Sequence, residues 1–318
     1  MRKLVAALVA LTVVVTAAVV GYRLLSGSAT LFAGGEECTA SVNGRTVTLT
    51  VEQAENAGLI SAISVQRGMP ARAATIALAA AFQESKLYNL ENGDRDSLGL
   101  FQQRPSQGWG TRAQILDPYY ATNAFYDALA KINGYESMAV TEAAQEVQRS
   151  GFPEAYAAHE ADARVLASAL TGNSPHAFSC QLDGNVKATG AKLNSVGLTH
   201  RADVVRRDAQ AVFGELSLGG FAPGGVTTGH MAGSAHYEGR AIDIFVRPIS
   251  AANKIRGWAI AHYLVAEAER LSIQTVIFDD RIWKSGSTDG WQNYNPPDAP
   301  GNRAILEHRD HVHVDVYA

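Results

Sequence analysis

The chain has 318 residues, of which 47% are hydrophobic and 18% are charged, a composition typical of folded globular protein rather than of disorder. Its length predicts about two domains, because single hydrophobic cores stop growing at roughly 250 residues. The formal net charge of -4 leaves no basic excess to neutralise phosphates, so nucleic acid is excluded as the expected partner.

The N-terminus has the pattern of a signal anchor. Arg2 and Lys3 precede an uncharged, mostly apolar run over residues 4–22. Such a run is close to the roughly 20 residues needed to cross a membrane, and it is longer than the apolar part of most cleaved signals. We expect a cytoplasmic tip (residues 1–3), one transmembrane helix, a stalk over residues 23–37 and all later residues outside the cell membrane. The alternative is a cleaved signal peptide and a secreted protein.

The chain has two cysteines, Cys38 and Cys180, which bracket the first half of the protein beyond the stalk. In an oxidising compartment such a pair is expected to form a disulfide, which by loop-closure arguments stabilises the fold by about 4 to 5 kcal/mol. The alternative is two unpaired, buried thiols.

Residues 38–170 are predicted to form a mostly helical domain. The helix expected over residues 71–84 is rich in Ala, Ile and Leu on nearly every face, which indicates a buried central helix. Pro70 precedes it, where helices commonly begin. A short strand and three more helices are expected over residues 47–51, 52–68, 118–132 and 140–170. Residues 171–191 have the composition of a linker.

Residues 192–318 are predicted to form a small α+β domain with an antiparallel sheet, so the protein is expected to be multidomain. Two helical patterns alternate here with apolar, β-branched runs. The helices are expected over residues 203–216 and 251–271, and the strands over residues 240–246, 274–278 and 311–317.

Glu84 is the first candidate catalytic residue. It lies at the C-terminal end of the predicted buried helix, and Gly99-Leu100-Phe101-Gln102 follows after a loop. A carboxylic acid in that position is poorly solvated and can stay protonated, ready to donate a proton to a glycosidic oxygen. This pattern favours glycan cleavage.

Glu84-Ser85, the Gly99–Gln102 segment and Tyr156 in Phe-Pro-Glu-Ala-Tyr resemble the lysozyme-like soluble lytic transglycosylase family. The resemblance covers roughly residues 53–170 and implies that Glu84 serves as both acid and base, with Tyr156 orienting it. The proton would be withdrawn from the sugar's own C6 hydroxyl, giving an anhydro sugar. The resemblance also implies a set of saccharide-binding residues, namely Ser85, Gly99, Leu100 and Gln102.

Two alternatives remain open at this site. A true muramidase would use a second carboxylate, for which Asp94 and Asp96 are the nearest candidates, although both are expected to be ordinary loop residues. The orienting role of Tyr156 could also fall to another tyrosine, namely Tyr119, Tyr120 or Tyr126.

The second candidate site combines histidines and aspartate. His236 and Asp243 lie seven positions apart, and Asp243 falls within an apolar strand, where a charge is costly unless it is paired. On the C-terminal strand, His311 and His313 point to the same face because the side-chain period is two. Two nitrogens and one oxygen can then converge and leave a fourth position for water, as catalytic zinc prefers.

The pattern Ser234-x-His236-x-x-Gly239-x-Ala241-x-Asp243, followed by His311-x-His313, resembles metallopeptidases of the D-alanyl-D-alanine carboxypeptidase, murein endopeptidase and hedgehog type. The resemblance implies Zn²⁺ bound by three ligands, His236, Asp243 and His313. It implies that His311 polarises the scissile carbonyl. Asp310 stands where relatives often carry a glutamate general base, with Glu307 and His308 nearby, and Arg240 is expected to bind substrate.

Together these patterns predict a membrane-tethered, bifunctional peptidoglycan hydrolase that cuts glycan strands and wall peptides. The runs Phe-Asp-Asp-Arg-Ile-Trp and His-Arg-Asp-His-Val-His-Val-Asp-Val-Tyr resemble actinobacterial proteins grouped with these peptidases. The alternative from another class is a non-catalytic wall-binding or assembly protein in which the C-terminal site has decayed. Trp283, Trp291 and Tyr294 are expected either to line a peptide groove or to belong to the core. His230 and His308 are expected to be structural or exposed.

Overall fold

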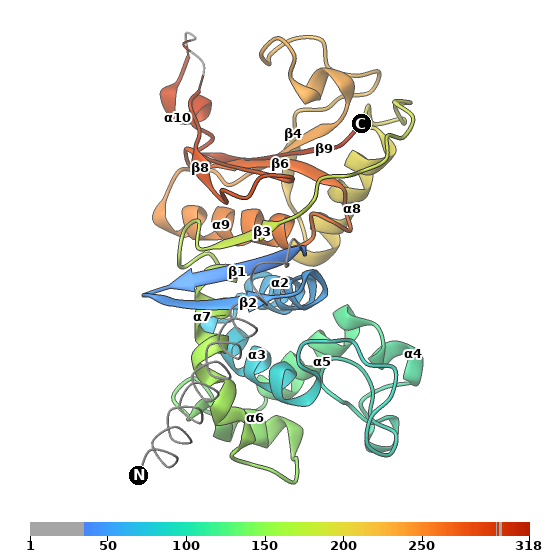
Figure 1. Cartoon of the computed structure of the whole chain (residues 1–318), viewed down its shortest axis with the longest axis vertical. Coiled ribbons are helices and arrows are strands. Elements are labelled where there is room, and N and C mark those ends of the chain that lie inside the picture. The colour runs from blue at the N-terminus through green and yellow to red at the C-terminus, as the bar shows by residue number, and fades with distance from the viewer. Residues whose placement is uncertain (1–34, 297, 299–300) are drawn as a thin grey trace, which may run out of the picture. The chain divides into compact units, whose positions relative to one another are not determined.

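The computed structural model describes residues 35–296, 298 and 301–318. This part of the chain contains helices and two antiparallel sheets, as the sequence predicts (Figure 1). The transmembrane helix expected over residues 4–22 lies outside the described residues, and so does the tip before it. Within the described part of the chain, no helix is both long and apolar enough to cross a membrane.

The first half is built around α3 (Ala71–Ser85), which is the buried helix that its composition predicts. Residues 73–81 are all buried, and the helix ends at Lys86, which has a left-handed φ of 58°. Four helices pack against it, namely α2 (Val51–Gln66), α5 (Pro118–Leu129), α6 (Val140–Gln148) and α7 (Glu160–Leu170). Three short turns of helix complete this half: η2 (Pro105–Gln107), α4 (Arg112–Ile115) and η3 (Ala155–His159).

The start of α2 is fixed by a capping box. The Thr50 hydroxyl accepts a hydrogen bond from the backbone N–H of Gln53 at 3.3 Å, and the Gln53 side chain accepts one from the backbone N–H of Thr50 at 3.0 Å. Such caps contribute about 1 kcal/mol by satisfying backbone donors that have no partner inside the helix.

The prediction of one helix over residues 140–170 is wrong. The chain forms α6, then an irregular segment and η3, and then α7. Arg149 ends α6 with a left-handed φ of 49°, and Gly151 and Pro153 follow at once. Both residue types disfavour continuation of a helix, which explains the break.

A three-stranded sheet joins the start and the end of the first half. Its order is β2-β1-β3, with β1 at Glu37–Val42, β2 at Arg45–Leu49 and β3 at Phe178–Gln181. Cys38 lies directly opposite Cys180 in the β1–β3 pair, and the two form a disulfide. The predicted disulfide is therefore confirmed, and the segment 171–191, predicted as a linker, contains a strand of this sheet.

The second half contains a six-stranded antiparallel sheet of order β4-β5-β9-β6-β7-β8. Its strands are β4 (Ser217–Gly219), β5 (Ala241–Phe245), β6 (Ile273–Phe278), β7 (Arg281–Lys284), β8 (Gln292–Asn293) and β9 (His311–Val316). Helix α9 (Ala251–Ala266) packs on β6 and β9 (Figure 1). The other helices here are α8 (His200–Phe213), η4 (Ala235–Glu238) and α10 (Arg303–Leu306).

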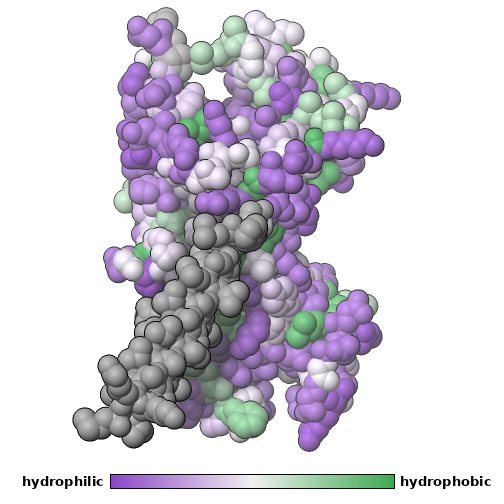
Figure 2. Space-filling model, in the orientation of Figure 1, coloured by the Kyte–Doolittle hydropathy of each residue, from purple (hydrophilic) through white to green (hydrophobic). Residues whose placement is uncertain are grey.

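Residues Glu36–Ala318 form one compact unit. Strand β3 contacts the second half through the Trp283 indole N–H, which donates to the Cys180 carbonyl at 3.1 Å, and the Trp291 N–H, which donates to the Phe178 carbonyl at 2.7 Å. The boundaries predicted for the two domains stay predictions. Figure 2 shows a mostly hydrophilic face with scattered hydrophobic residues, as is usual for folded proteins.

Candidate metal centre and candidate glycan site

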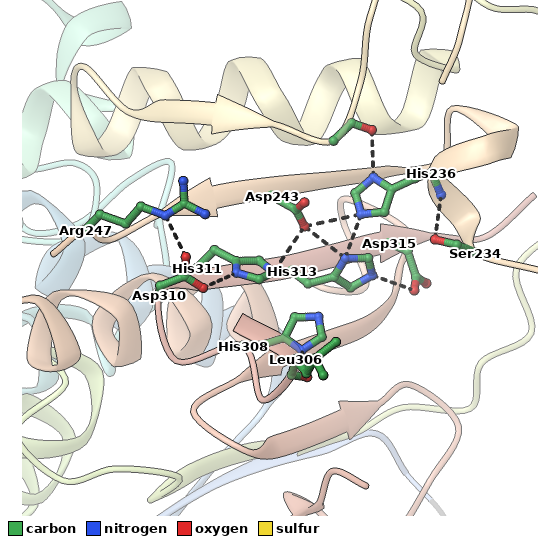
Figure 3. Close-up of polar contacts among 11 residues, drawn as sticks. Ser234, His236, Asp243, Arg247, Leu306, His308, Asp310, His311, His313 and Asp315 are labelled. Carbon is green, nitrogen blue, oxygen red and sulfur yellow. Dashed lines mark hydrogen bonds and ion pairs between the residues drawn. The ribbon is translucent and has the colours of Figure 1, made fainter. Parts of the chain in front are cut away.

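The pairing of β5 with β9 brings the predicted metal ligands together. Asp243 lies directly opposite His313 in this antiparallel pair, although 70 positions separate them in the chain. Residues opposite each other on adjacent strands share a face, and their Cβ atoms lie about 5 Å apart. His236 reaches the same face from η4, which precedes β5 (Figure 3).

Three potential ligand atoms converge at this point. The Oδ1 atom of Asp243 lies 3.3 Å from His236 Nε2 and 3.2 Å from His313 Nδ1, and the two nitrogens are 3.1 Å apart. All three residues are buried. Ligands held at 2.0–2.1 Å from a tetrahedral zinc ion are about 3.3 Å apart, so these spacings fit such an ion closely. This His-His-Asp cluster can hold a metal ion.

In His236 and in His313, the ring nitrogen that faces away from Asp243 already donates a hydrogen bond. The nitrogen that faces Asp243 is thereby left free to bind a metal. His236 donates from Nδ1 to the Gly220 carbonyl at 2.7 Å, and His313 donates from Nε2 to Asp315 at 3.4 Å. These bonds fix the tautomers so that the lone pairs of His236 Nε2 and His313 Nδ1 face Asp243. Metal-binding histidines are usually oriented by such outer partners.

The carboxylates around His313 favour a positive charge within the cluster. Burial lowers the pKa of His313, but its bonds to the carboxylates of Asp243 and Asp315 outweigh burial and raise it to about 9. Burial likewise raises the pKa of Asp243, yet the bonds to His236 and His313 prevail and hold it well below its usual range. A proton or a metal cation between these atoms satisfies the same demand.

A groove of about 980 Å³ opens beside the cluster. His311 and His313 both line it, as the period of the strand predicts. His311 donates from Nδ1 to Asp310 at 2.7 Å, and its Nε2 lies 3.8 Å from Asp243 Oδ1. The other carboxylate oxygen of Asp310 accepts from Arg247 Nε at 2.6 Å (Figure 3).

These contacts bear on the predicted general base. Asp310 is 4% exposed, and both its oxygens are engaged by His311 and Arg247. A carboxylate held in this way can orient His311. The role of general base that the motif implies for Asp310 stays a prediction.

Two histidines expected to be structural or exposed, His308 and His230, line the groove. His308 is half-buried, with its ring centroid 4.6 Å from that of His311, and donates from Nδ1 to the Leu306 carbonyl at 3.2 Å. Burial lowers the pKa of His308 to about 3, so the ring is neutral at neutral pH. His230 stacks on His236 with ring centroids 3.8 Å apart. Their placement beside the cluster does not follow from the sequence, because neither belongs to the ligand signature.

His230 also belongs to a potential metal-binding set. One ligand atom from each of His230, His236 and Asp243 lies within 4.8 Å of the others. His313 is not part of this set, but its Nδ1 lies closer, at 3.1 Å from His236 Nε2 and 3.2 Å from Asp243 Oδ1.

Residues predicted to line the groove divide into two groups. Arg240 and Tyr294 line it, although Arg240 donates to the Val316 carbonyl at 2.6 Å and to Glu238 at 2.6 Å. Trp283 is fully buried in the core and Trp291 packs against the core, and both bond strand β3. Gly239 has a left-handed φ of 66°, and a Cβ there would lie 2.4 Å from Leu193, so the close approach of the backbone requires glycine.

At the first candidate site, Tyr156 contacts Glu84. The buried Tyr156 hydroxyl donates to Glu84 Oε1 at 2.7 Å, and Glu84 itself is half-buried in the last turn of α3. Tyr126 instead donates to the Ile60 carbonyl at 2.9 Å. Among the described residues, Tyr156 is therefore the tyrosine that can orient Glu84.

The Gly99–Gln102 segment is held against the end of α3. The Ser85 hydroxyl donates to the Leu100 carbonyl at 2.7 Å, and the Gln102 amide donates to the Gly99 carbonyl at 3.2 Å. A Cβ on Gly99 would lie 2.6 Å from the Ile115 carbonyl, so the backbone approach requires glycine. Ser85 and Gly99 thus position the segment that the resemblance assigns to the saccharide groove.

The two candidate second carboxylates have different surroundings. Asp96 is bonded by Arg104 Nε at 2.7 Å and by the backbone N–H of Ser106 at 2.8 Å, and these contacts hold its pKa well below its usual range. The Asp94 side chain is 92% exposed. These contacts hold the loop of Asp96 in place, as expected for an ordinary loop residue.

Comparison with known proteins adds one match. Residues 194–303 match the family model described as VldE, C-terminal domain. The match covers about a third of the chain, includes His230, His236 and Asp243, and ends before His308 and His313. No curated protein matches the chain significantly.

Proposed function

We propose that this protein is a peptidoglycan hydrolase with two sites, a zinc-dependent peptidase centre at His236, Asp243 and His313 and a glycan-cleaving site at Glu84. The observation that carries the proposal is the trio of distances, 3.1 to 3.3 Å, among one carboxylate oxygen and two imidazole nitrogens. A site of three protein ligands beside an open groove is the usual form of a catalytic rather than a structural zinc centre.

Zinc bound here supplies Lewis-acid polarisation of a peptide carbonyl and activation of water. The chain's own residues supply the rest. His311, fixed by Asp310 and Arg247, presents Nε2 to the groove and can donate a hydrogen bond to a developing oxyanion when protonated. His308 donates from Nδ1 to Leu306, so its neutral ring can accept a hydrogen bond from substrate at Nε2. A pKa lowered to about 3 makes His308 a weak proton acceptor, so in this proposal Asp310 keeps the role of general base that the motif implies.

The glycan site rests on the Tyr156–Glu84 bond. A hydrogen bond from a buried hydroxyl holds one Glu84 oxygen in place and leaves the other for the glycosidic bond. Because Asp96 is bound by Arg104 and Ser106, it is a poor second carboxylate. This favours the lytic transglycosylase reaction over a muramidase reaction. Two sites in one chain raise the local concentration of each on the same wall strand.

The rival proposal is a wall-binding protein with a decayed C-terminal site. Metal content and product analysis distinguish the two: the parent protein, His236→Ala and Glu84→Gln are compared for bound zinc and for products of peptidoglycan digestion resolved by mass. Equimolar zinc and peptide cleavage, both lost in His236→Ala, support the peptidase centre. Glycan cleavage lost in Glu84→Gln, with peptide cleavage retained, supports the second site. Intact wall material after digestion by the zinc-loaded parent rejects both.

A further inference from the structure

The groove contains an imidazole that the three-ligand centre does not use. His230 lies in the segment between β4 and η4, which has no helix or strand from residue 220 to 234 and contains five glycines. Its ring stacks on the ligand His236 with centroids 3.8 Å apart and an interplanar angle of 24°. A ligand atom of His230 lies within 4.8 Å of those of His236 and Asp243.

We propose that His230 is a fourth protein ligand, which closes the metal centre in the absence of substrate and must leave it for water and a peptide to enter. The inference rests on the proposed zinc centre and deepens it. A tetrahedral ion held by His236, Asp243 and His313 has one remaining position, and a fourth protein ligand there is the mark of a closed rather than a catalytic site. The glycine-rich segment 220–234, hereafter the His230 loop, would then act as an autoinhibitory gate.

The side chain of His230 is suited to this role. It is half-buried beside the cluster, and none of the hydrogen bonds formed among the described residues involves its imidazole. It lines the same groove as His311 and His313.

The backbone of His230 is held by a residue of the ligand motif itself. The hydroxyl of Tyr237, next to His236 in sequence, accepts from the His230 N–H at 3.0 Å and donates to the His230 carbonyl. One side chain therefore fastens the loop residue at both backbone groups and sets the position of its imidazole. Exposed Met231, the next residue, lines the groove mouth and offers a matched control within the same loop.

The test uses the full-length protein, stripped of metal and loaded with one equivalent of zinc. X-ray absorption counts imidazole ligands, and competition with a chromophoric chelator measures zinc affinity. The parent is expected to show three imidazoles and His230→Ala two, with zinc affinity at least about tenfold weaker, since even outer-partner losses cost 10- to 100-fold. Met231→Ala should match the parent, and Tyr237→Phe should weaken zinc binding by a smaller factor than His230→Ala.

Peptide cleavage at saturating zinc provides the second readout. If His230 closes the centre, His230→Ala is faster than the parent under that condition, although its affinity for zinc is weaker. Two imidazoles in both proteins, with equal zinc affinity, overturn the inference and leave the three-ligand centre intact. A parent that binds no zinc overturns the proposed function itself. Equal losses of zinc affinity in Met231→Ala and His230→Ala would assign the effect to the loop and also overturn the inference.

Discussion

His236 donates a hydrogen bond from Nδ1 to the carbonyl oxygen of Gly220 at 2.7 Å, and the same glycine has no room for a side chain. A Cβ on Gly220 would lie 2.2 Å from His236 Cε1 and 3.0 Å from Asp243 Oδ2. The backbone of the loop therefore both orients the imidazole and defines one wall of the centre.

Gly220→Ala is expected to displace His236 and to weaken zinc binding at least about tenfold, because the outer bond and the ligand position are lost together. Chelator competition measures the change. Gly224→Ala is the matched control, since Gly224 has a similar left-handed φ, 84° against 80°, but no atom within 4 Å of its Cβ. Equal zinc affinities in the two variants would show that strain of the loop, rather than the clash with His236, governs the site.

Tyr156→Phe is expected to reduce glycan cleavage about 10- to 100-fold, because Glu84 loses the bond that orients it, while Glu84→Gln should remove at least the 10²- to 10⁴-fold that acid–base catalysis typically contributes. Muropeptides released from the wall, resolved by mass, give both rates. Tyr126→Phe also deletes a buried hydroxyl, but one that bonds the Ile60 carbonyl, so it should leave cleavage nearly unchanged. A rate for Tyr156→Phe equal to that of Tyr126→Phe would contradict the orienting role.

Asp310→Asn should lower peptide cleavage 10²- to 10⁴-fold without loss of zinc, as expected for a general base that also orients His311. His308→Ala should cost less, because a ring with its pKa lowered to about 3 is a weak proton acceptor. The two variants are compared by kcat with zinc content measured in parallel. The reverse order of these losses would contradict Asp310 as the general base.

The stability of the protein should fall in mild acid because of His262. This fully buried residue donates from Nδ1 to the Ala169 carbonyl at 2.8 Å, and its Nε2 has no partner. Burial lowers its pKa to about 4. From pH 6.5 down to about 4 the unfolded chain binds a proton that the folded chain refuses, so stability present above pH 6.5 is lost as the pH falls, by about 3 kcal/mol.

The free energy of unfolding, measured by urea denaturation across that pH range, checks this effect. His262→Phe should remove most of this part of the pH dependence, whereas His200→Gln, which changes an exposed histidine, should retain it. An unchanged slope in His262→Phe would trace the acid sensitivity to other groups.

The sequence predicts the elements of the metal centre better than their surroundings. An aspartate in an apolar strand and two histidines with a period of two indicate shared faces, and these patterns are local. The register that sets Asp243 opposite His313 is a property of two strands 70 positions apart, which local patterns cannot specify. The bond from Asp310 to Arg247 and the placement of His230 depend on loops whose paths are set by tertiary packing.

The same limit explains the errors in the first half. The buried helix α3 and the Glu84 position follow from composition, but the break after Gln148 is set by Arg149, Gly151 and Pro153 together. The sequence predicts a linker where β3 lies, because Gly172, Pro175 and Gly184 surround a short apolar run. Its strand character comes from pairing with β1, more than 130 residues earlier in the chain.

Strand β3 is bonded on two sides, by the disulfide and ladder of β1 and by the indole N–H groups of Trp283 and Trp291. A segment held in this way is packed against both halves instead of forming a flexible linker. If both sites act on the wall, their separation is therefore set in part by these contacts. The spacing of glycan and peptide cuts would then be dictated by the protein, and wall material whose mesh does not match that spacing would be cut at one site at a time.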